Sequence, residues 1–423
     1  MDRLTSQAEW RARAAAVLPA GGFGNFDPSV VIARGEGSRV WDADGVEYVD
    51  YLIGSGPMLL GHGHPEVLEA VYRQLPRGMT FFANNPSGIE LAEDIIAAVP
   101  CAQSVRFVAS GGEADMYAIR AARAFTGRPK LVKFEGGYHG MSAEAQMSLA
   151  PSRPANFPHP IPDSAGISNA VASEVLVAPF NDIDALDGLL REHAGDVAAV
   201  IAEPLQRIVP AQPGFPEALR EVCTRHDVLL IFDEIVTGFR LDYGGAQERY
   251  GVVPDLATFG KIIGGGFPLA AITGRANIMA HFDKNEVGSE GWLMQLGTLS
   301  GNPVASVAGM KTMEILRREG QYDRLKALGG TLQAMMTEAL TSRGIPHQIV
   351  GDTTLFDVVF TDRDVLTYRD SIAGNADHAT TWNRVLRENG VFKSPGKVYP
   401  HLALTDDDLD LTRRAVIAAA EAL

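Results

Sequence analysis

Leu229-Leu230-Ile231-Phe232-Asp233-Glu234-Ile235-Val236-Thr237-Gly238-Phe239-Arg240 is the stretch that decides the fold. Its first four residues are apolar, and a short apolar run of this kind predicts a strand that is buried on both faces. Two acids follow where the run stops. Because ligands of open α/β sheets bind at the carboxyl ends of the strands, Asp233 stands where chemistry is usually carried out.

A lysine follows in the apolar segment Thr258-Phe259-Gly260-Lys261-Ile262-Ile263. Such neighbours can keep a lysine amine neutral and nucleophilic. A buried carboxylate and an activated lysine are what a pyridoxal phosphate (PLP) site needs: Asp233 would keep the pyridine nitrogen protonated, and Lys261 would form the Schiff base. Both residues could equally have ordinary structural roles, because acids favour helix N-termini and a lone lysine is usually a solvated surface group.

Length and composition limit the class of protein. A chain of 423 residues predicts two or three domains. The formal net charge of -15 argues against nucleic acid or an anionic membrane as a partner. Only two cysteines, no apolar run of membrane-spanning length and no signal-peptide pattern at the N-terminus predict a cytoplasmic protein.

A second strand predicts where an anion would bind. Val105-Arg106-Phe107-Val108 runs into Ala109-Ser110-Gly111-Gly112, and a helix pattern follows. Small residues between a strand and a helix N-terminus form a phosphate cradle, because free N–H groups and the helix dipole favour an anion. The segment has neither a dinucleotide fingerprint nor a Gly-Lys-Ser/Thr phosphate loop. A tight strand-to-helix turn with no ligand would show the same pattern.

Two further strands end in polar residues. Leu131-Val132-Lys133-Phe134 is followed by Gly136-Gly137-Tyr138-His139-Gly140, whose aromatic pair is suited to stacking on a flat ring. The apolar run 197–202 ends at Glu203-Pro204-Leu205-Gln206. Strands alternate with helical segments from about 105 to 275, and this predicts an α/β fold with a mainly parallel sheet.

The chain ends have a different pattern. We expect residues 1–60 to form part of a small domain, 61–305 a large PLP-binding domain, and 306–423 a long connecting helix and the rest of the small α+β domain. Residues 151–168, which contain five prolines, predict an irregular excursion. His62 and His64 have no Cys or acidic partner at ligand spacing, and we therefore expect no metal site.

The order of motifs resembles class III aminotransferases of PLP fold type I, and among them the glutamate-1-semialdehyde aminomutase-like branch. The motifs are Trp41-Asp-Ala-Asp-Gly, Gly61-His-Gly-His-Pro, Ser110-Gly-x-Glu-Ala, Tyr138-His-Gly, Glu203-Pro, Asp233-Glu-x-x-Thr-Gly-Phe-Arg, Gly260-Lys and Gly297-Thr-x-Ser-Gly-Asn-Pro. Each motif alone is weak, but together, in this order and from about Pro19 to the C-terminus, they are highly specific.

The resemblance implies a role for each matching residue. Lys261 would form the Schiff base and Asp233 would pair with the pyridine nitrogen. The other implied cofactor contacts are Ser110, Gly111 and Gly112 at the phosphate, Tyr138 and His139 stacked on the ring, Ile235 on its opposite face, and Glu203 beside it. Thr298 would reach the phosphate in the neighbouring subunit, which implies a homodimer with shared sites.

Three departures from the family pattern concern binding. Gly112 stands where the family usually has Ser or Thr. The cofactor's phenolic oxygen usually meets a Gln at the position of Val236 or an Asn at the position of Ile208, and Gln206 is the candidate substitute. Phe23 and Phe26 occupy the loop where the aminomutase carries a Ser and an Arg. These aromatics either line an apolar substrate pocket or pin the loop to the core.

The expected function is therefore PLP-dependent amino transfer between an amine or amino acid and a keto acid or aldehyde. The alternatives are a glutamate-1-semialdehyde-type 2,1-aminomutase and, from a different class, a protein that binds PLP without turnover. A carboxylate anchor for the substrate, if there is one, would be Lys397 or Arg207.

Overall fold

The structure is a computed structural model that describes residues 6–193 and 195–423. These residues form two compact units. The first unit runs to Pro65 and adds Asp323–Asp362 and Gly374–Leu423, while the second comprises Glu66–Tyr322 and Arg363–Ala373. The domain boundaries at residues 60 and 305 stay a prediction; the units differ from them mainly in that helix α11 (Pro303–Leu316) lies within the second unit.

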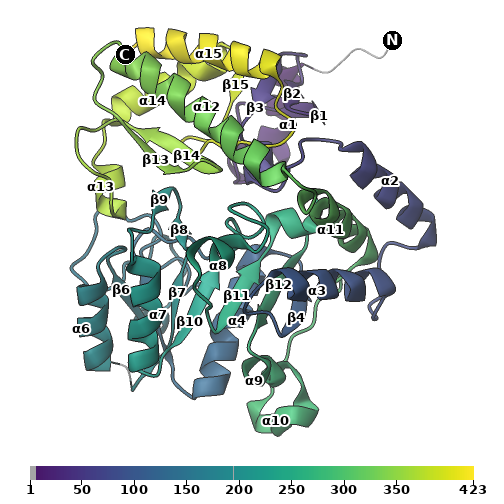
Figure 1. Ribbon diagram of the computed structural model, residues 1–423, viewed down its shortest axis with the longest axis vertical. Helices are drawn as coiled ribbons and strands as arrows, with labels where there is room; N and C mark the ends of the chain where they lie inside the picture. The colour runs from purple at the N-terminus through teal and green to yellow at the C-terminus, as the bar shows by residue number, and fades with distance from the viewer. Residues whose placement is uncertain (1–5, 194) are drawn as a thin grey trace. The chain divides into compact units, whose positions relative to one another are not determined.

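The second unit is built on a seven-stranded sheet (Figure 1). In spatial order its strands are β4 (Ser104–Val108), β12 (Ala270–Gly274), β11 (Leu256–Phe259), β10 (Leu229–Asp233), β7 (Val197–Ala202), β5 (Lys130–Phe134) and β6 (Val175–Ala178). Only β12 runs antiparallel to its neighbours; the other pairs in this sheet are parallel. The predicted mainly parallel sheet is confirmed.

Helices cover the sheet because its strands are apolar on both faces. Every residue of β7 and β10 is buried. Helix α4 (Gly111–Thr126) packs against the sheet through a stripe of fully buried alanines, Ala114, Ala118, Ala121 and Ala122. The small side chains let the helix backbone approach the strands closely. The other helices of this unit include α2 (Pro65–Gln74), α3 (Pro86–Ala98), α6 (Ile183–His193), α7 (Phe215–Arg225), α8 (Gly245–Tyr250) and α13 (Tyr368–Ile372).

The parallel strands bring their carboxyl ends to one edge of the sheet. β4 leads into Ser110, β7 into Glu203, β10 ends at Asp233, and β11 leads through Gly260 into Lys261. Residues far apart in the sequence therefore share one edge. The segment 151–168 is irregular, as predicted.

The first unit has an α+β architecture formed by both chain ends. Its larger sheet has the order β1 (Ile32–Glu36), β2 (Arg39–Asp42), β3 (Glu47–Asp50) and β15 (Val391–Phe392). β15 pairs in parallel with β3, so the C-terminal part of the chain completes an N-terminal sheet. A hairpin and four helices accompany it: β13 (Gln348–Asp352), β14 (Leu355–Val359), α1 (Gln7–Val17), α12 (Gln321–Thr341), α14 (Ala376–Glu388) and α15 (Asp406–Glu421).

This unit has its own core, which contains Val49, Leu332, Phe356 and Trp382. No helix in the described part of the chain is both long and apolar enough to cross a membrane.

Candidate active site

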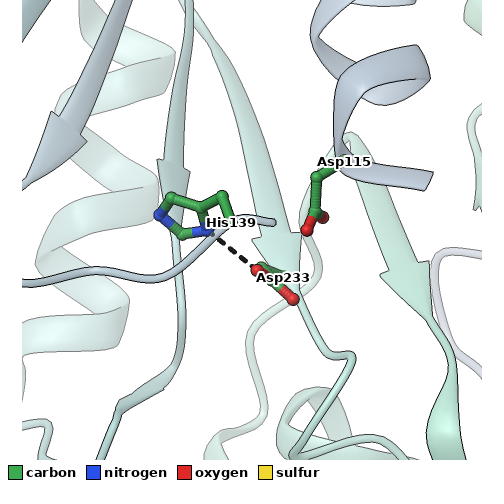
Figure 2. Close-up of side chains that lie close together, drawn as sticks. All are labelled: Asp115, His139 and Asp233. Carbon is green, nitrogen blue, oxygen red and sulfur yellow. Dashed lines mark hydrogen bonds and ion pairs between the residues drawn. The ribbon is translucent and has the colours of Figure 1, made fainter. Parts of the chain in front are cut away.

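Asp233 is the acid at the carboxyl end of β10. Its side chain is 4% exposed, and its Oδ2 lies 2.8 Å from Nδ1 of His139 (Figure 2). Its Oδ1 accepts a hydrogen bond from the backbone N–H of Ile235 at 3.1 Å. When His139 carries its proton on Nδ1, both oxygens of Asp233 accept a hydrogen bond, and such donors stabilise an ionised carboxylate. The structure therefore places a charge-competent acid at the strand end that the sequence singled out.

The Tyr138-His139 loop is held next to this acid by Glu203. The Oε2 of Glu203 accepts a hydrogen bond from the backbone N–H of Tyr138 at 2.8 Å. The Glu203 side chain is 4% exposed and the His139 side chain 1%, whereas Tyr138 is 38% exposed. One residue of the aromatic pair is thus buried against Asp233, and the other keeps an accessible ring.

Two buried polar atoms flank the glycine of this loop. The Nε2 of His139 and the Oε1 of Gln206 have no hydrogen-bond partner among the described residues, although the Nε2 of Gln206 donates to the carbonyl of Glu135 at 2.8 Å. A Cβ added at Gly137 would lie 3.0 Å from the first atom and 3.6 Å from the second. Buried polar atoms without partners are rare in native structures, and these two leave hydrogen-bonding capacity at this loop that a polar ligand could use.

The predicted phosphate cradle lies at the N-terminus of α4. Ser110 is the N-cap residue, and its hydroxyl accepts from the backbone N–H of Glu113 while the Glu113 carboxylate accepts from the backbone N–H of Ser110. This capping box orders the first turn of a helix of 16 residues. The helix dipole and the remaining N–H groups of that turn favour a bound anion.

Ile235 connects this cradle to the lysine segment. A Cβ at Gly111 would lie 2.9 Å from Cγ2 of Ile235, and a Cβ at Gly260 would lie 3.1 Å from its Cδ1. Both glycines therefore pack closely against one side chain, most tightly at Gly111. Since Gly260 directly precedes Lys261, the cradle, Ile235 and the lysine belong to one site.

The departure at position 112 has a steric reason. A Cβ at Gly112 would lie 3.2 Å from Cα of Gly140, which itself has a φ of +83°. A serine or threonine at this position would push against the glycine that closes the Tyr138 loop. Position 112 thus lacks a hydroxyl because the loop before α4 and the Tyr138 loop lie close together there.

Lys261 is half-buried and opens the short 3₁₀ helix Lys261–Gly264. Its φ is +50°, in the left-handed region that a non-glycine residue adopts at a cost of order 1–3 kcal/mol. Strand β11 leads into it, and Thr258 of β11 pairs in register with Asp233 of β10. Neighbouring parallel strands thus deliver the acid and the lysine, and the strained backbone at the lysine is typical of a functional position.

Three other predicted contacts have different surroundings. Thr298 is exposed, and its carbonyl accepts from the hydroxyl of Thr80 at 3.2 Å. Phe23 and Phe26 belong to the first unit, where Phe23 is 85% exposed and Phe26 packs edge-on against Phe392 with ring centroids 5.1 Å apart. The substrate role of the two phenylalanines stays a prediction.

Sequence reasoning missed two buried titratable residues of the site. Asp115 of α4 lies beside Asp233 and His139, and its side chain is 1% exposed. Lys133 of β5 is fully buried, and its Nζ donates to the carbonyls of Gly137, Ala145 and Met147 at 3.0, 3.0 and 2.6 Å. Each had a signal in the sequence: an acid on the alanine face of a helix, and a lysine in an otherwise apolar strand.

The donor set fits PLP. Asp233 would meet its ring nitrogen, the N-terminus of α4 its phosphate, Ile235 and the Tyr138-His139 loop its ring, and Lys261 its aldehyde carbon. PLP supplies an electron sink for the carbon that loses a proton. The glycine cradle, the two partnerless buried atoms and the strained lysine are the features of this structure that support the fit.

Comparison with known proteins agrees with this chemistry. The family model for class III aminotransferases matches residues 24–419. A protein named glutamate-1-semialdehyde 2,1-aminomutase 2, from Brevibacillus brevis, is 39% identical over 392 residues, which cover 91% of this chain and 90% of its own length.

Solved structures show the same fold. An omega-transaminase from Sphaerobacter thermophilus is 36% identical and superposes with a TM-score of 0.93, covering 100% of this chain and 98% of its own. A beta-phenylalanine aminotransferase from Variovorax paradoxus is 31% identical with a TM-score of 0.84, covering 97% and 92%. The chain therefore belongs to the class III aminotransferases, enzymes of PLP fold type I that transfer amino groups with pyridoxal 5'-phosphate as cofactor.

Proposed function

We propose that Lys261 and Asp233 carry the amino transfer in this enzyme. The observation that supports this most directly is the convergence of an acid, a strained lysine and a glycine cradle at one sheet edge, packed around Ile235.

Each residue has a separate task in the proposal. The Lys261 amine would hold the cofactor between turnovers, and it would act as the base that takes the proton from the donor carbon bearing the amino group. The ionised Asp233 stabilises positive charge on the ring nitrogen. Glu203 and His139 keep Tyr138 and Asp233 in place through the bonds described above. Gln206 and Ser110 supply polar contacts.

An intermolecular transaminase is the first candidate. The omega-transaminase and the beta-phenylalanine aminotransferase carry such activities in their names, and the loop with Phe23 and Phe26 lacks the Ser and Arg of the aminomutases. Intramolecular transfer is the second candidate, because the relative from Brevibacillus brevis is named an aminomutase. A screen of amine and amino acid donors with one keto acid, beside a glutamate-1-semialdehyde assay, separates the two.

We also infer a homodimer in which Thr298 reaches the neighbouring site. Thr298 lies in a segment whose apolar side chains face solvent, including Leu296 at 66% and Leu299 at 47% exposure. An exposed apolar patch of this kind is typical of a protein interface. The cysteines Cys101 and Cys223 are buried thiols, which supports a cytoplasmic location.

The test of the proposal is the replacement Lys261→Ala. We expect the purified parent to be yellow, and the variant to lose the absorbance of lysine-bound cofactor, its reduction by borohydride and its turnover. Lys130→Ala is the control, since that lysine forms only a surface ion pair with Asp196. Full activity of Lys261→Ala would end the assignment.

A further inference from the structure

Asp115 is a buried acid with no cationic partner. It lies in the first turns of α4, its side chain is 1% exposed, and its Oδ1 accepts a hydrogen bond from the hydroxyl of Thr258 at 2.6 Å. Among the residues that the structure describes, no lysine or arginine forms an ion pair with it. A buried carboxylate without a counter-ion is costly, so Asp115 needs another way to lose its charge.

A second carboxyl group lies next to it. One ligand atom from each of Asp115, His139 and Asp233 lies within 4.8 Å of the other two, and Figure 2 shows the three side chains converging from α4, the Tyr138 loop and the end of β10. Two ionised carboxylates this close in a buried site repel each other strongly. Burial and the charge of Asp233 raise the pKa of Asp115 well above its ordinary value of 3.8.

The hydrogen bonds indicate which acid keeps the charge. Asp233 accepts from Ile235 N–H on one oxygen and is 2.8 Å from His139 Nδ1 on the other. For Asp115, the one donor found among the described residues is the hydroxyl of Thr258. Hydrogen-bond donors favour the ionised form of a carboxyl group, so a proton shared by this pair is better placed on Asp115 than on Asp233. The remaining acid near this pair is Glu203, whose Oε2 is occupied by the N–H of Tyr138.

We propose that Asp115 is a positioning residue that stays protonated and donates a hydrogen bond to the carboxylate of Asp233, keeping Asp233 ionised and oriented for the cofactor. The proposal rests on the role assigned to Asp233 under the proposed function. A protonated Asp115 adds a third donor to Asp233 and lowers the basicity of that carboxylate. An Asp233 held in this way would favour a protonated ring nitrogen when the cofactor is bound.

Two substitutions separate this role from simple packing. Asp115→Asn retains an N–H donor for Asp233 and an oxygen that accepts from Thr258, whereas Asp115→Leu has a similar size and no donor. Asp255→Asn is the matched control. Asp255 is also a buried acid, but it forms ion pairs with Arg220 and Arg275. It stands just before β11, at the end of that strand away from Lys261.

The readouts are the dissociation constant of PLP from the apo-protein, the ¹⁵N chemical shift of ring-labelled PLP, and the melting temperature of the apo-protein. We expect Asp115→Leu to weaken PLP binding at least about ten-fold and to move the ring nitrogen signal toward the unprotonated form. Asp115→Asn should stay within about three-fold of the parent and keep the protonated signal. Asp255→Asn should lower the melting temperature and leave both cofactor readouts unchanged.

Three outcomes would overturn the proposal. If Asp115→Asn and Asp115→Leu change the ring nitrogen signal equally, a hydrogen bond donated to Asp233 is not the cause. The negative charge of Asp115 would then be what acts on the ring nitrogen. If both change only the melting temperature, as Asp255→Asn does, Asp115 is structural. If the parent apo-protein binds one Zn²⁺ or Mn²⁺ and Asp115→Asn does not, the three side chains form a cation site.

Asp233→Asn distinguishes this failure from failure of the proposed function. A ring nitrogen signal that is unchanged in Asp233→Asn would show that Asp233 does not protonate the cofactor, whatever the Asp115 variants do. A signal that changes in Asp233→Asn but not in Asp115→Leu would sink the Asp115 proposal alone.

Discussion

At the scale of a single residue, Asp233→Asn tests the acid of the site. The amide keeps the shape of the side chain, but it removes the negative charge that would face a protonated ring nitrogen. We expect the rate of amino transfer to fall at least ~100-fold, about 2.7 kcal/mol, with the cofactor still bound. Steady-state kinetics and the visible spectrum check this together. A rate within a few-fold of the parent would assign the task to another acid.

Phe23 and Phe26 allow a second test at this scale, because their surroundings differ. Phe26 packs on Phe392, whereas Phe23 is 85% exposed in the single chain. We expect Phe26→Ala to lower the melting temperature, since an aromatic pair and its burial are lost. We expect Phe23→Ala to leave the melting temperature unchanged and to raise KM for apolar donors. A strong native preference for a dicarboxylate-sized anionic donor would contradict the pocket interpretation of Phe23.

At the scale of elements, β5 and the loop after it depend on Lys133. Its ammonium donates to three carbonyls of residues 137–147, the segment that carries Tyr138 and His139. Lys133→Met keeps the apolar stem and leaves three buried acceptors without a donor. We expect the free energy of unfolding to fall by about 3 kcal/mol and PLP affinity to fall with it. Lys130→Met on the same strand, whose lysine forms a surface ion pair, should cost less than about 1 kcal/mol.

Lys133 also predicts a pH dependence. Burial lowers the pKa of Lys133 from 10.5 to about 7, although the nearby Glu203 raises it in part. Between about pH 7 and 10 the folded protein therefore binds fewer protons at this position than the unfolded chain, whose lysine titrates near 10.4. By linkage, the free energy of unfolding rises with pH across this window.

Urea unfolding at several pH values measures this effect. The stability difference between the parent and Lys133→Met should widen from pH 7 to pH 9, because only the parent gains from the lowered pKa. If this stability difference is the same at pH 7 and pH 9, Lys133 stays charged over the whole range. The hydrogen bonds to the three carbonyls would then offset the cost of burying the charge.

Strands β10 and β12 and helix α4 show how much of the fold and the site the sequence could predict. Strand β10 and Asp233 were predictable because an apolar run that stops at an acid is typical of a buried strand ending at a ligand site. The antiparallel direction of β12 was not, because a strand buried on both faces has the same apolar pattern in either direction. Asp115 was missed because an acid in the first turns of a helix is normally a favourable dipole contact, and only the packing of α4 on β10 and β11 buries it.

At the scale of the whole molecule, the exposed apolar side chains of the second unit indicate a partner. Many of them come from α2, the segment before α3, α3 itself and the Thr298 segment: Tyr72, Leu75, Met79, Phe81, Phe82, Ile89, Ile96, Met294, Leu296 and Leu299. Phe82, Ile89, Ile96 and Leu296 border one cavity of about 470 Å³. An exposed apolar patch around such a cavity is typical of a protein interface.

We expect a second copy of the chain to cover this patch, and Phe82→Asp together with Leu296→Asp to break the dimer. A buried charge without a partner at the centre of an interface is strongly unfavourable, so the variant should sediment as a monomer at micromolar concentration. Ile417→Asp on α15, at a similarly exposed apolar position of the first unit, is the control and should leave the dimer intact.

The dimer prediction also decides the role of Thr298. If Thr298 completes the neighbouring phosphate site, the monomeric variant should lose PLP on gel filtration, and Thr298→Ala should weaken PLP binding while the chain stays dimeric. If the monomeric variant loses PLP but Thr298→Ala binds it normally, the dimer stabilises the site and Thr298 does not contact the cofactor. If the parent protein sediments as a monomer with full cofactor occupancy, both the dimer and the role of Thr298 in a neighbouring site are contradicted. The exposed patch would then bind a different partner.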